Sequence, residues 1–164
     1  MNSSSKKALI VVAVVLVLLA ICFGCFFEVK METIEERLED SYFDTTLVEN
    51  VYMKNLQALP EKEKFNIFTA NVIFAAYGLE NFDNVKSVLY AYKRAPGTFV
   101  AVEFKTEKEA KDFFKELKDN WNIKTPQSID DYTYGKAGNI VYIGDVSAVR
   151  SAFEFPRTLF IREK

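Results

Sequence analysis

The sequence predicts an α+β protein: an N-terminal transmembrane helix, then a small domain in which three or four mainly antiparallel strands pack against helices. Three observations carry this prediction. Residues 8–27 contain no charge and no proline, residues 86–104 hold two segments that alternate in polarity, and several segments repeat apolar residues at helical spacing. Fifteen Phe, eight Tyr and one Trp supply enough large apolar side chains for a core.

Residues 8–27 form the predicted membrane anchor. A helix of about twenty residues spans roughly 30 Å, the thickness of a bilayer's hydrocarbon core. In lipid, such a helix satisfies all of its backbone donors and acceptors within one segment. The bilayer is therefore the predicted partner of these residues. Two alternatives stay open: a cleaved signal peptide, or a lipoprotein anchored through Cys22 in the segment Leu-Ala-Ile-Cys.

The charges on either side of the anchor predict its orientation. Lys6 and Lys7 precede it together with the amino terminus, whereas acidic residues dominate positions 28–40. Because basic flanks tend to stay in the cytoplasm, we expect the rest of the chain to lie outside it. The predicted organisation is a short cytoplasmic N-terminus (1–7), the transmembrane anchor (8–27), a juxtamembrane helix or stalk (28–45) and an extracytoplasmic α+β domain (46–164).

Three helices are predicted between residues 31 and 79. The first, at residues 31–42, carries Met31, Ile34, Leu38 and Tyr42 on one face, and it either docks on the domain or forms a coiled-coil stalk. The second, at residues 47–58, has weaker periodicity. The third begins at Pro60, ends near Gly78 and should be largely buried. Apolar residues recur at helical spacing, and three more widen the apolar face; a strand over the same stretch stays the alternative. The recurring residues are Phe65, Phe68, Val72, Ala75, Ala76 and Leu79, and the widening ones are Ile67, Ile73 and Phe74.

A β-hairpin and a helix follow. Residues 86–93 and 98–104 both alternate in polarity, and the segment between them contains a Pro-Gly pair that is typical of a turn. Thr106 and Glu109 have the spacing of a capping box, in which each side chain bonds the other residue's backbone N–H. We therefore expect an amphipathic helix from this point to about Asn120.

The C-terminal part of the chain completes the predicted domain. A strand is expected at residues 139–143, and Asp145 should cap a helix at residues 146–153. Pro156 ends that helix, and residues 158–161 are expected to form a last edge strand. With this order of elements, we expect the helices to cover one face of an antiparallel sheet.

The best candidate for a ligand or partner surface is the irregular stretch at residues 121–137. Long loops in small domains often carry function. This one holds the only tryptophan of the chain together with paired carboxylates and tyrosines. The candidate residues are Trp121, Asp130, Asp131, Tyr132 and Tyr134. The alternative is a connection in which Trp121 serves only as an anchor to the core.

Composition argues against most enzyme classes. The chain has no histidine, which is the commonest general base and metal ligand. Its only cysteines, Cys22 and Cys25, lie within the predicted anchor. No glycine-rich phosphate loop, metal motif or basic stripe for nucleic acid is present, so no cofactor, metal or nucleic acid is predicted.

Two functional hypotheses follow. The first is a non-enzymatic interaction or accessory module of the cell envelope, with an envelope protein as its partner. The second is a small-ligand-binding or carboxylate-dependent enzyme domain tethered to the membrane. A deep pocket lined by Asp130, Asp131 or Asp145 with tyrosines would favour the second hypothesis, and a closed core with a flat apolar patch would favour the first.

Overall fold

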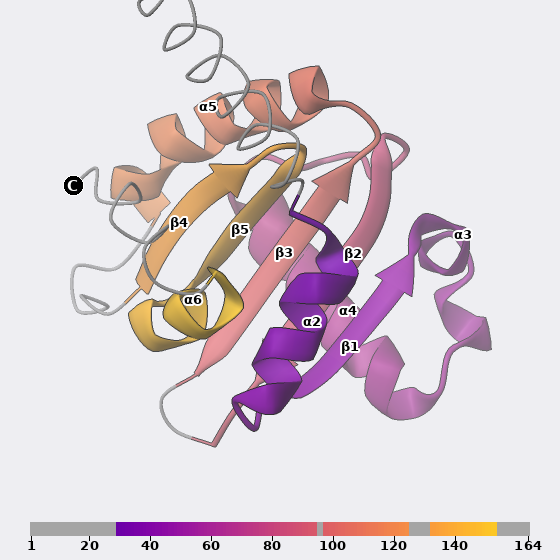
Figure 1. Ribbon diagram of the computed structural model, residues 1–164. Coiled ribbons are helices and arrows are strands. Elements are labelled where there is room, and N and C mark those ends of the chain that lie inside the picture. Colours follow the sequence, from indigo (N-terminus) through magenta and orange to yellow (C-terminus); the bar gives the residue numbers. More distant parts are fainter. Residues whose placement is uncertain (1–28, 95–96, 125–131, 154–164) are drawn as a thin grey trace, which may run out of the picture.

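A computed structural model describes residues 29–94, 97–124 and 132–153, which form a five-stranded antiparallel sheet with helices on both faces (Figure 1). The predicted α+β class is confirmed. The predicted anchor at residues 8–27 and the predicted strand at 158–161 lie outside the described residues. Within the described part of the chain, no helix combines the length and the apolar character that crossing a bilayer requires.

Helices and strands are interspersed along the chain without a repeating order. The helices are α2 (Met31–Asp40), α3 (Asn50–Met53), α4 (Glu61–Ala76), α5 (Glu107–Lys124) and α6 (Val146–Phe153), with a 3₁₀ turn η1 (Leu56–Ala58). The strands are β1 (Asp44–Glu49), β2 (Val85–Tyr92), β3 (Thr98–Phe104), β4 (Tyr132–Ala137) and β5 (Ile140–Asp145). The sheet order is β1-β2-β3-β5-β4, so β1 and β4 are its edges.

The predicted β2–β3 hairpin is confirmed. Tyr90 pairs with Val100 in an antiparallel register, and the Lys93 N–H donates to the Gly97 carbonyl at 2.8 Å, which closes the connection. A second hairpin joins β4 to β5 through Gly138 and Asn139. Gly138 has a φ of +61°, the left-handed conformation that tight hairpin turns require.

The core has two layers because both faces of the sheet are apolar. On one face, α4 and α5 cover alternate residues of the central strands, including Val88, Val100 and Val102. On the other, α2 and α6 cover their neighbours Leu89 and Ala101. In Figure 1, α2 and α6 lie in front of the sheet and α4 lies behind it. The expectation of helices on one face only is therefore wrong.

The first helix docks on the sheet. Met31, Ile34 and Leu38 on α2 are each at most 1% exposed and pack with α6 and the sheet. This apolar face is already used, so it is not free for a coiled coil. Tyr42 was expected on the same face, but the helix ends before it. Tyr42 has a φ of +65° and is 85% exposed.

The helix predicted at residues 47–58 is wrong in its first part. Asp44–Glu49 pairs with β2 as edge strand β1, and only short helical turns follow it. Thr46 and Val48 are buried, whereas Thr45, Leu47 and Glu49 are more exposed. This alternation is typical of a strand. The sheet therefore has five strands instead of three or four, because pairing with β2 outweighs a weak helical periodicity.

The orientation predicted for the helix after Pro60 is wrong in part. Its bounds agree, since α4 spans Glu61–Ala76 and Gly78 follows with a φ of +111°. The buried side, however, comprises Asn66, Ile67, Ala70 and Phe74. Ile67, Phe74 and Leu79 are thus buried as expected. The other recurring apolar residues face outward instead: Phe65, Phe68, Val72, Ala75 and Ala76. Both sides are apolar, so periodicity alone does not decide which side meets the sheet.

Two caps predicted from sequence are confirmed. The Thr106 N–H donates to the Glu109 carboxylate at 3.0 Å and the Glu109 N–H donates to the Thr106 hydroxyl at 3.3 Å, which begins α5. Asp145 accepts the Ala148 N–H at 2.9 Å and begins α6. The helix after Thr106 runs to Lys124, beyond the predicted end near Asn120.

Helix α2 also supplies polar contacts along edge strand β1. The Glu35 carboxylate accepts a hydrogen bond from the backbone N–H of Leu47. The Thr45 hydroxyl lies between two carboxylates, 2.7 Å from that of Glu39 and 3.4 Å from that of Glu35, and its one hydrogen is shared between them. Unpaired N–H groups on an edge strand invite pairing with other chains. Because the Glu35 carboxylate accepts the Leu47 N–H, this N–H is not available to a strand of another chain.

We predict that Glu35 makes stability depend on pH in the weakly acidic range. Burial, together with the negative charge of Glu39, raises the pKa of the Glu35 carboxyl above its ordinary value. At pH values between the pKa of Glu35 in the unfolded chain and its higher pKa in the folded chain, the folded chain binds more protons than the unfolded chain does. The free energy of unfolding therefore falls as the pH rises through this range. Glu35→Gln keeps an acceptor oxygen and should flatten this slope in urea unfolding curves. The exposed Glu36→Gln should leave the slope unchanged, and equal slopes in both variants would contradict the assignment.

Candidate functional site

The structure brings three of the five predicted site residues together. Trp121 lies in the last turn and a half of α5, while Tyr132 and Tyr134 lie on edge strand β4. Asp130 and Asp131 lie outside the described residues. The stretch at 121–137 is therefore not one long loop: its first residues extend a helix and its last ones form a strand.

Trp121 stands at the centre of an aromatic cluster, formed by Tyr77, Phe114, Trp121 and Tyr134. Its ring centroid lies 4.4 Å from that of Tyr134 and 5.2 Å from that of Tyr77, which it stacks at 22°. The ring centroid of Phe114 lies 5.9 Å from that of Tyr134. These residues are half-buried and pack against the core on the α4–α5 face. The cluster therefore ties together the ends of α4 and α5 and strand β4.

Hydrogen bonds reinforce this junction. The Asn120 side-chain amide donates to the Tyr77 carbonyl at 3.4 Å and to the Glu116 carbonyl at 3.1 Å. Tyr77 stacks on the ring of Trp121 and the tilted ring of Tyr134 lies beside it, so the indole is engaged within the cluster. The geometry supports the anchoring alternative for Trp121, and a partner contact at Tyr132 and Tyr134 stays a prediction.

Asp145 caps helix α6 and lines neither of the two hollows beside α4. Its side chain is buried, and one carboxylate oxygen accepts hydrogen bonds from the Ser147 hydroxyl at 2.6 Å and the Ala148 N–H at 2.9 Å. The other oxygen has no partner within the described residues. Because a capping carboxylate works as a fixed acceptor, this residue is poorly placed for acid–base chemistry.

A second buried carboxylate, Glu103 on β3, is fully engaged. It accepts hydrogen bonds from the Lys86 ammonium at 2.8 Å, the Ser87 hydroxyl at 2.8 Å and the Asn139 amide at 3.3 Å. A buried charge needs such partners to be tolerated. Among the described residues, no group of three His, Cys, Asp or Glu side chains is arranged to hold a metal ion.

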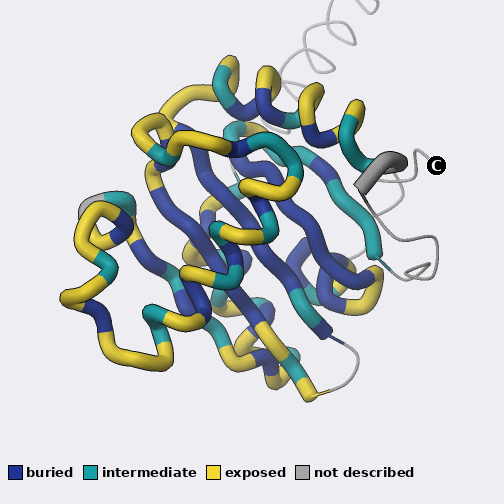
Figure 2. The backbone as a smooth tube through the Cα atoms, turned by 180° about the vertical axis from the view of Figure 1, so that it is seen from behind, coloured by how far each residue is buried: buried dark blue, intermediate teal, exposed yellow. Residues whose placement is uncertain are grey.

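The most conspicuous surface feature is one that the sequence prediction assigned to the core. The outward side of α4 carries a row of exposed apolar residues, in which Phe65 is 67% exposed, Phe68 59% and Val72 51%. We call this row the α4 stripe: Phe65, Phe68, Val72, Ala75 and Ala76, all of them exposed. In the tube coloured by burial, the sheet is largely buried while exposed residues gather on the helices (Figure 2).

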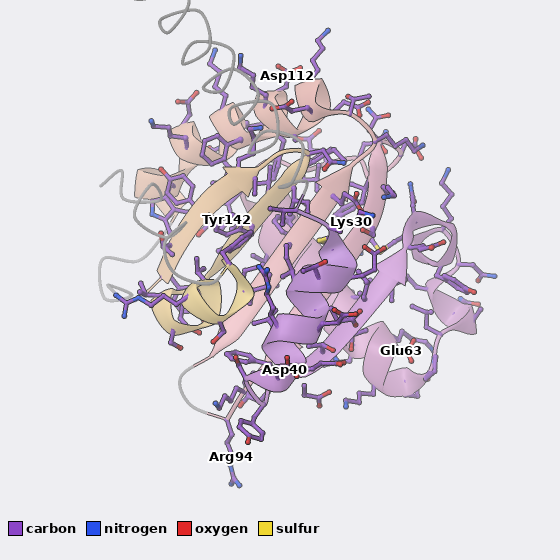
Figure 3. The ribbon with its side chains drawn as sticks, in the orientation of Figure 1. Lys30, Asp40, Glu63, Arg94, Asp112 and Tyr142 are labelled. Carbon is purple, nitrogen blue, oxygen red and sulfur yellow. The ribbon has the colours of Figure 1, made fainter. Side chains whose placement is uncertain are left out.

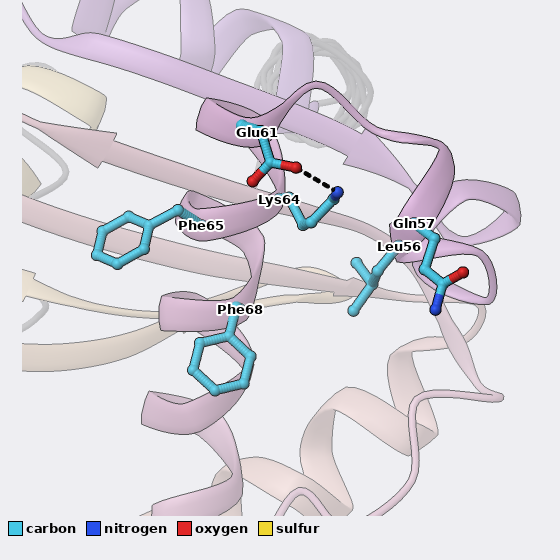
Figure 4. A pocket seen from close by; sticks show the side chains of 6 residues that line it. All are labelled: Leu56, Gln57, Glu61, Lys64, Phe65 and Phe68. Carbon is cyan, nitrogen blue, oxygen red and sulfur yellow. Dashed lines mark hydrogen bonds and ion pairs between the residues drawn. The ribbon is translucent and has the colours of Figure 1, made fainter.

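Two shallow hollows flank Phe65. The larger, of about 390 Å³, lies between η1 and α4 and is lined by Leu56, Gln57, Glu61, Lys64, Phe65 and Phe68 (Figure 4). The smaller, of about 230 Å³, is lined by Asp44, Phe65, Asn66, Tyr90 and Tyr92. Both are open to solvent, and neither brings several titratable groups together in an enclosed space. They suit the side chains of a macromolecule better than a small substrate.

Comparisons with known proteins assign no family to this chain. No protein-family model matches it, no curated protein matches it, and no solved structure matches it. Its function therefore has to be inferred from its own side chains. Of these, the α4 stripe is the group whose exposure the fold itself does not explain.

We predict that Trp121 is a structural anchor. Trp121→Ala should lower the free energy of unfolding by about 2–3 kcal/mol, less than the roughly 3–5 kcal/mol of a fully buried aromatic residue, because the ring is only half-buried. Trp121→Phe keeps a stacking ring and should retain most of the stability. Urea unfolding followed by circular dichroism measures both. A stable Trp121→Ala variant would indicate a ring held for a partner instead.

Proposed function

We propose that this chain is a membrane-anchored, non-enzymatic interaction module of the cell envelope. A single transmembrane helix at residues 8–27 holds it, the N-terminus is cytoplasmic, and the folded domain binds a protein outside the cytoplasm. The uncharged sequence of residues 8–27, with basic residues before it and acidic residues after it, supports the anchor and its orientation. The α4 stripe supports the binding role.

The α4 stripe is the single observation that carries the proposal. Burying one phenylalanine side chain is worth about 1.5–3 kcal/mol, so leaving two largely exposed forgoes a substantial free energy. The fold does not need these rings, because α4 already packs on the sheet through Ile67, Ala70 and Phe74. An exposed apolar patch that the fold does not use is typical of a protein contact surface.

The alternative, a carboxylate-dependent enzyme, has less support. The two buried carboxylates of the described residues, Asp145 and Glu103, both accept hydrogen bonds that fix them in structural roles. The hollows beside α4 are open to solvent, and neither lining contains more than one carboxylate. Neither arrangement resembles a pair of carboxylates poised on either side of a substrate.

Site-specific photocrosslinking tests the proposed function. The full-length chain carries Phe68→benzoylphenylalanine, an aromatic replacement at an exposed site, in its native membrane. Irradiation should produce covalent adducts with protein. The matched control is Lys111→benzoylphenylalanine on the exposed side of α5, which should yield far fewer adducts. If position 68 gives no protein adducts beyond the control, or adducts with lipid alone, the proposed protein contact is wrong.

A further inference from the structure

The α4 stripe is graded in size along the helix. Its N-terminal half presents the bulky rings of Phe65 and Phe68, whereas its C-terminal half presents the small side chains of Ala75 and Ala76. Val72 lies between them. A helix that is bulky at one end and small at the other fits a second such helix running in the opposite direction, since each large side chain then meets a small one.

The spacing of the stripe fits a single two-fold axis. If two copies of α4 pack antiparallel, Phe65 lies opposite Ala75 of the second copy and Phe68 lies opposite Val72 of the second copy. Both pairs are centred on position 70, so one axis satisfies both, as an isologous interface requires. A parallel arrangement would instead place ring against ring and alanine against alanine, leaving a gap at one end.

The hollows around the stripe provide room for the rings. Phe65 lines both hollows, and Phe68 borders the larger of them (Figure 4). A surface that has both ridges and adjacent grooves is able to interdigitate with a copy of itself. The exposed Tyr92, which is 48% exposed and lines the smaller hollow, extends the apolar area beyond the helix.

The charges at the rim do not oppose such a contact. Lys64 pairs with Glu61 at 2.8 Å, and Lys62 pairs with Asp44 at 2.6 Å. Repulsion between identical charged groups is a common obstacle to association across a two-fold axis. Here the lysines of the first turn of α4 are already matched by carboxylates of the same chain.

We propose that the occupant of the α4 stripe is a second copy of this chain, held by antiparallel α4–α4 packing. This inference rests on the proposed function and names its partner. A bilayer is the less suitable occupant, because the first turn of α4, just before Phe65, carries the carboxylates of Glu61 and Glu63 (Figure 3 labels Glu63), and charged groups are costly in hydrocarbon.

The size of the stripe indicates a weak dimer. With roughly 150–250 Å² for a whole aromatic side chain, the stripe and Tyr92 expose apolar area on the order of 400 Å² per copy. A pair would bury about twice this, less than the ~1,200–2,000 Å² of stable complexes. Copies anchored in one membrane meet at a much higher effective concentration than free ones, so the dimer should form in vesicles and dissociate on dilution in detergent.

Cysteine crosslinking in phospholipid vesicles tests the inference. The full-length chain carries Cys22→Ser and Cys25→Ser, and two differently tagged preparations carry either Phe65→Cys or Ala75→Cys. Reconstituted together and oxidised, they should shift from the monomer band to a mixed 65–75 dimer. Each preparation alone should give little dimer, because positions 65 and 75 lie about 15 Å apart along the helix. Phe68→Cys with Val72→Cys forms a second pair, and Lys111→Cys is the control.

The outcomes separate this inference from the proposed function. Dominant 65–65 crosslinks would show parallel association and overturn the antiparallel arrangement. If no pair exceeds the Lys111→Cys control while benzoylphenylalanine at position 68 still gives adducts with a different protein, self-association is wrong and the interaction module stands. If the photocrosslink also gives no protein adduct, both are wrong.

Discussion

The sheet has apolar side chains on both faces, and this constraint governs the arrangement of the rest of the described chain. Neighbouring residues of a strand point to opposite faces, so Val88 and Val102 need one cover while Leu89 and Ala101 need another. Helices α4 and α5 supply the first cover, and α2 and α6 supply the second. The helix next to the predicted anchor is thus part of the core and not a free spacer.

Helix α4 goes beyond what this constraint requires. One apolar side is enough to cover the sheet, and Ile67, Ala70 and Phe74 provide it. A second apolar side faces solvent along the same helix. The aromatic cluster around Trp121 has a different character, because its rings stack on one another and close the junction between α4, α5 and β4. The fold thus accounts for that cluster but not for the α4 stripe.

The sequence allows local features to be predicted better than the arrangement of faces. The hairpin, the Thr106–Glu109 capping box and the Asp145 cap depend on neighbouring residues, and all three are confirmed. Strand β1 was missed because its identity comes from pairing with β2, about forty residues further along the chain. The candidate site shows the same limit. Trp121, Tyr132 and Tyr134 were recognised as neighbours, but α4 is apolar on both sides, so its exposed rings were assigned to the core.

The most direct test of this account is the stability of the double variant Phe65→Lys and Phe68→Lys, measured by urea unfolding of the purified chain at low concentration. If the fold uses only the inner side of α4, the free energy of unfolding should change by no more than about 1 kcal/mol. The buried-side variant Phe74→Ala should lose about 3–5 kcal/mol under the same conditions. A comparable loss in the double variant would contradict the account, because it would place the α4 stripe in the core.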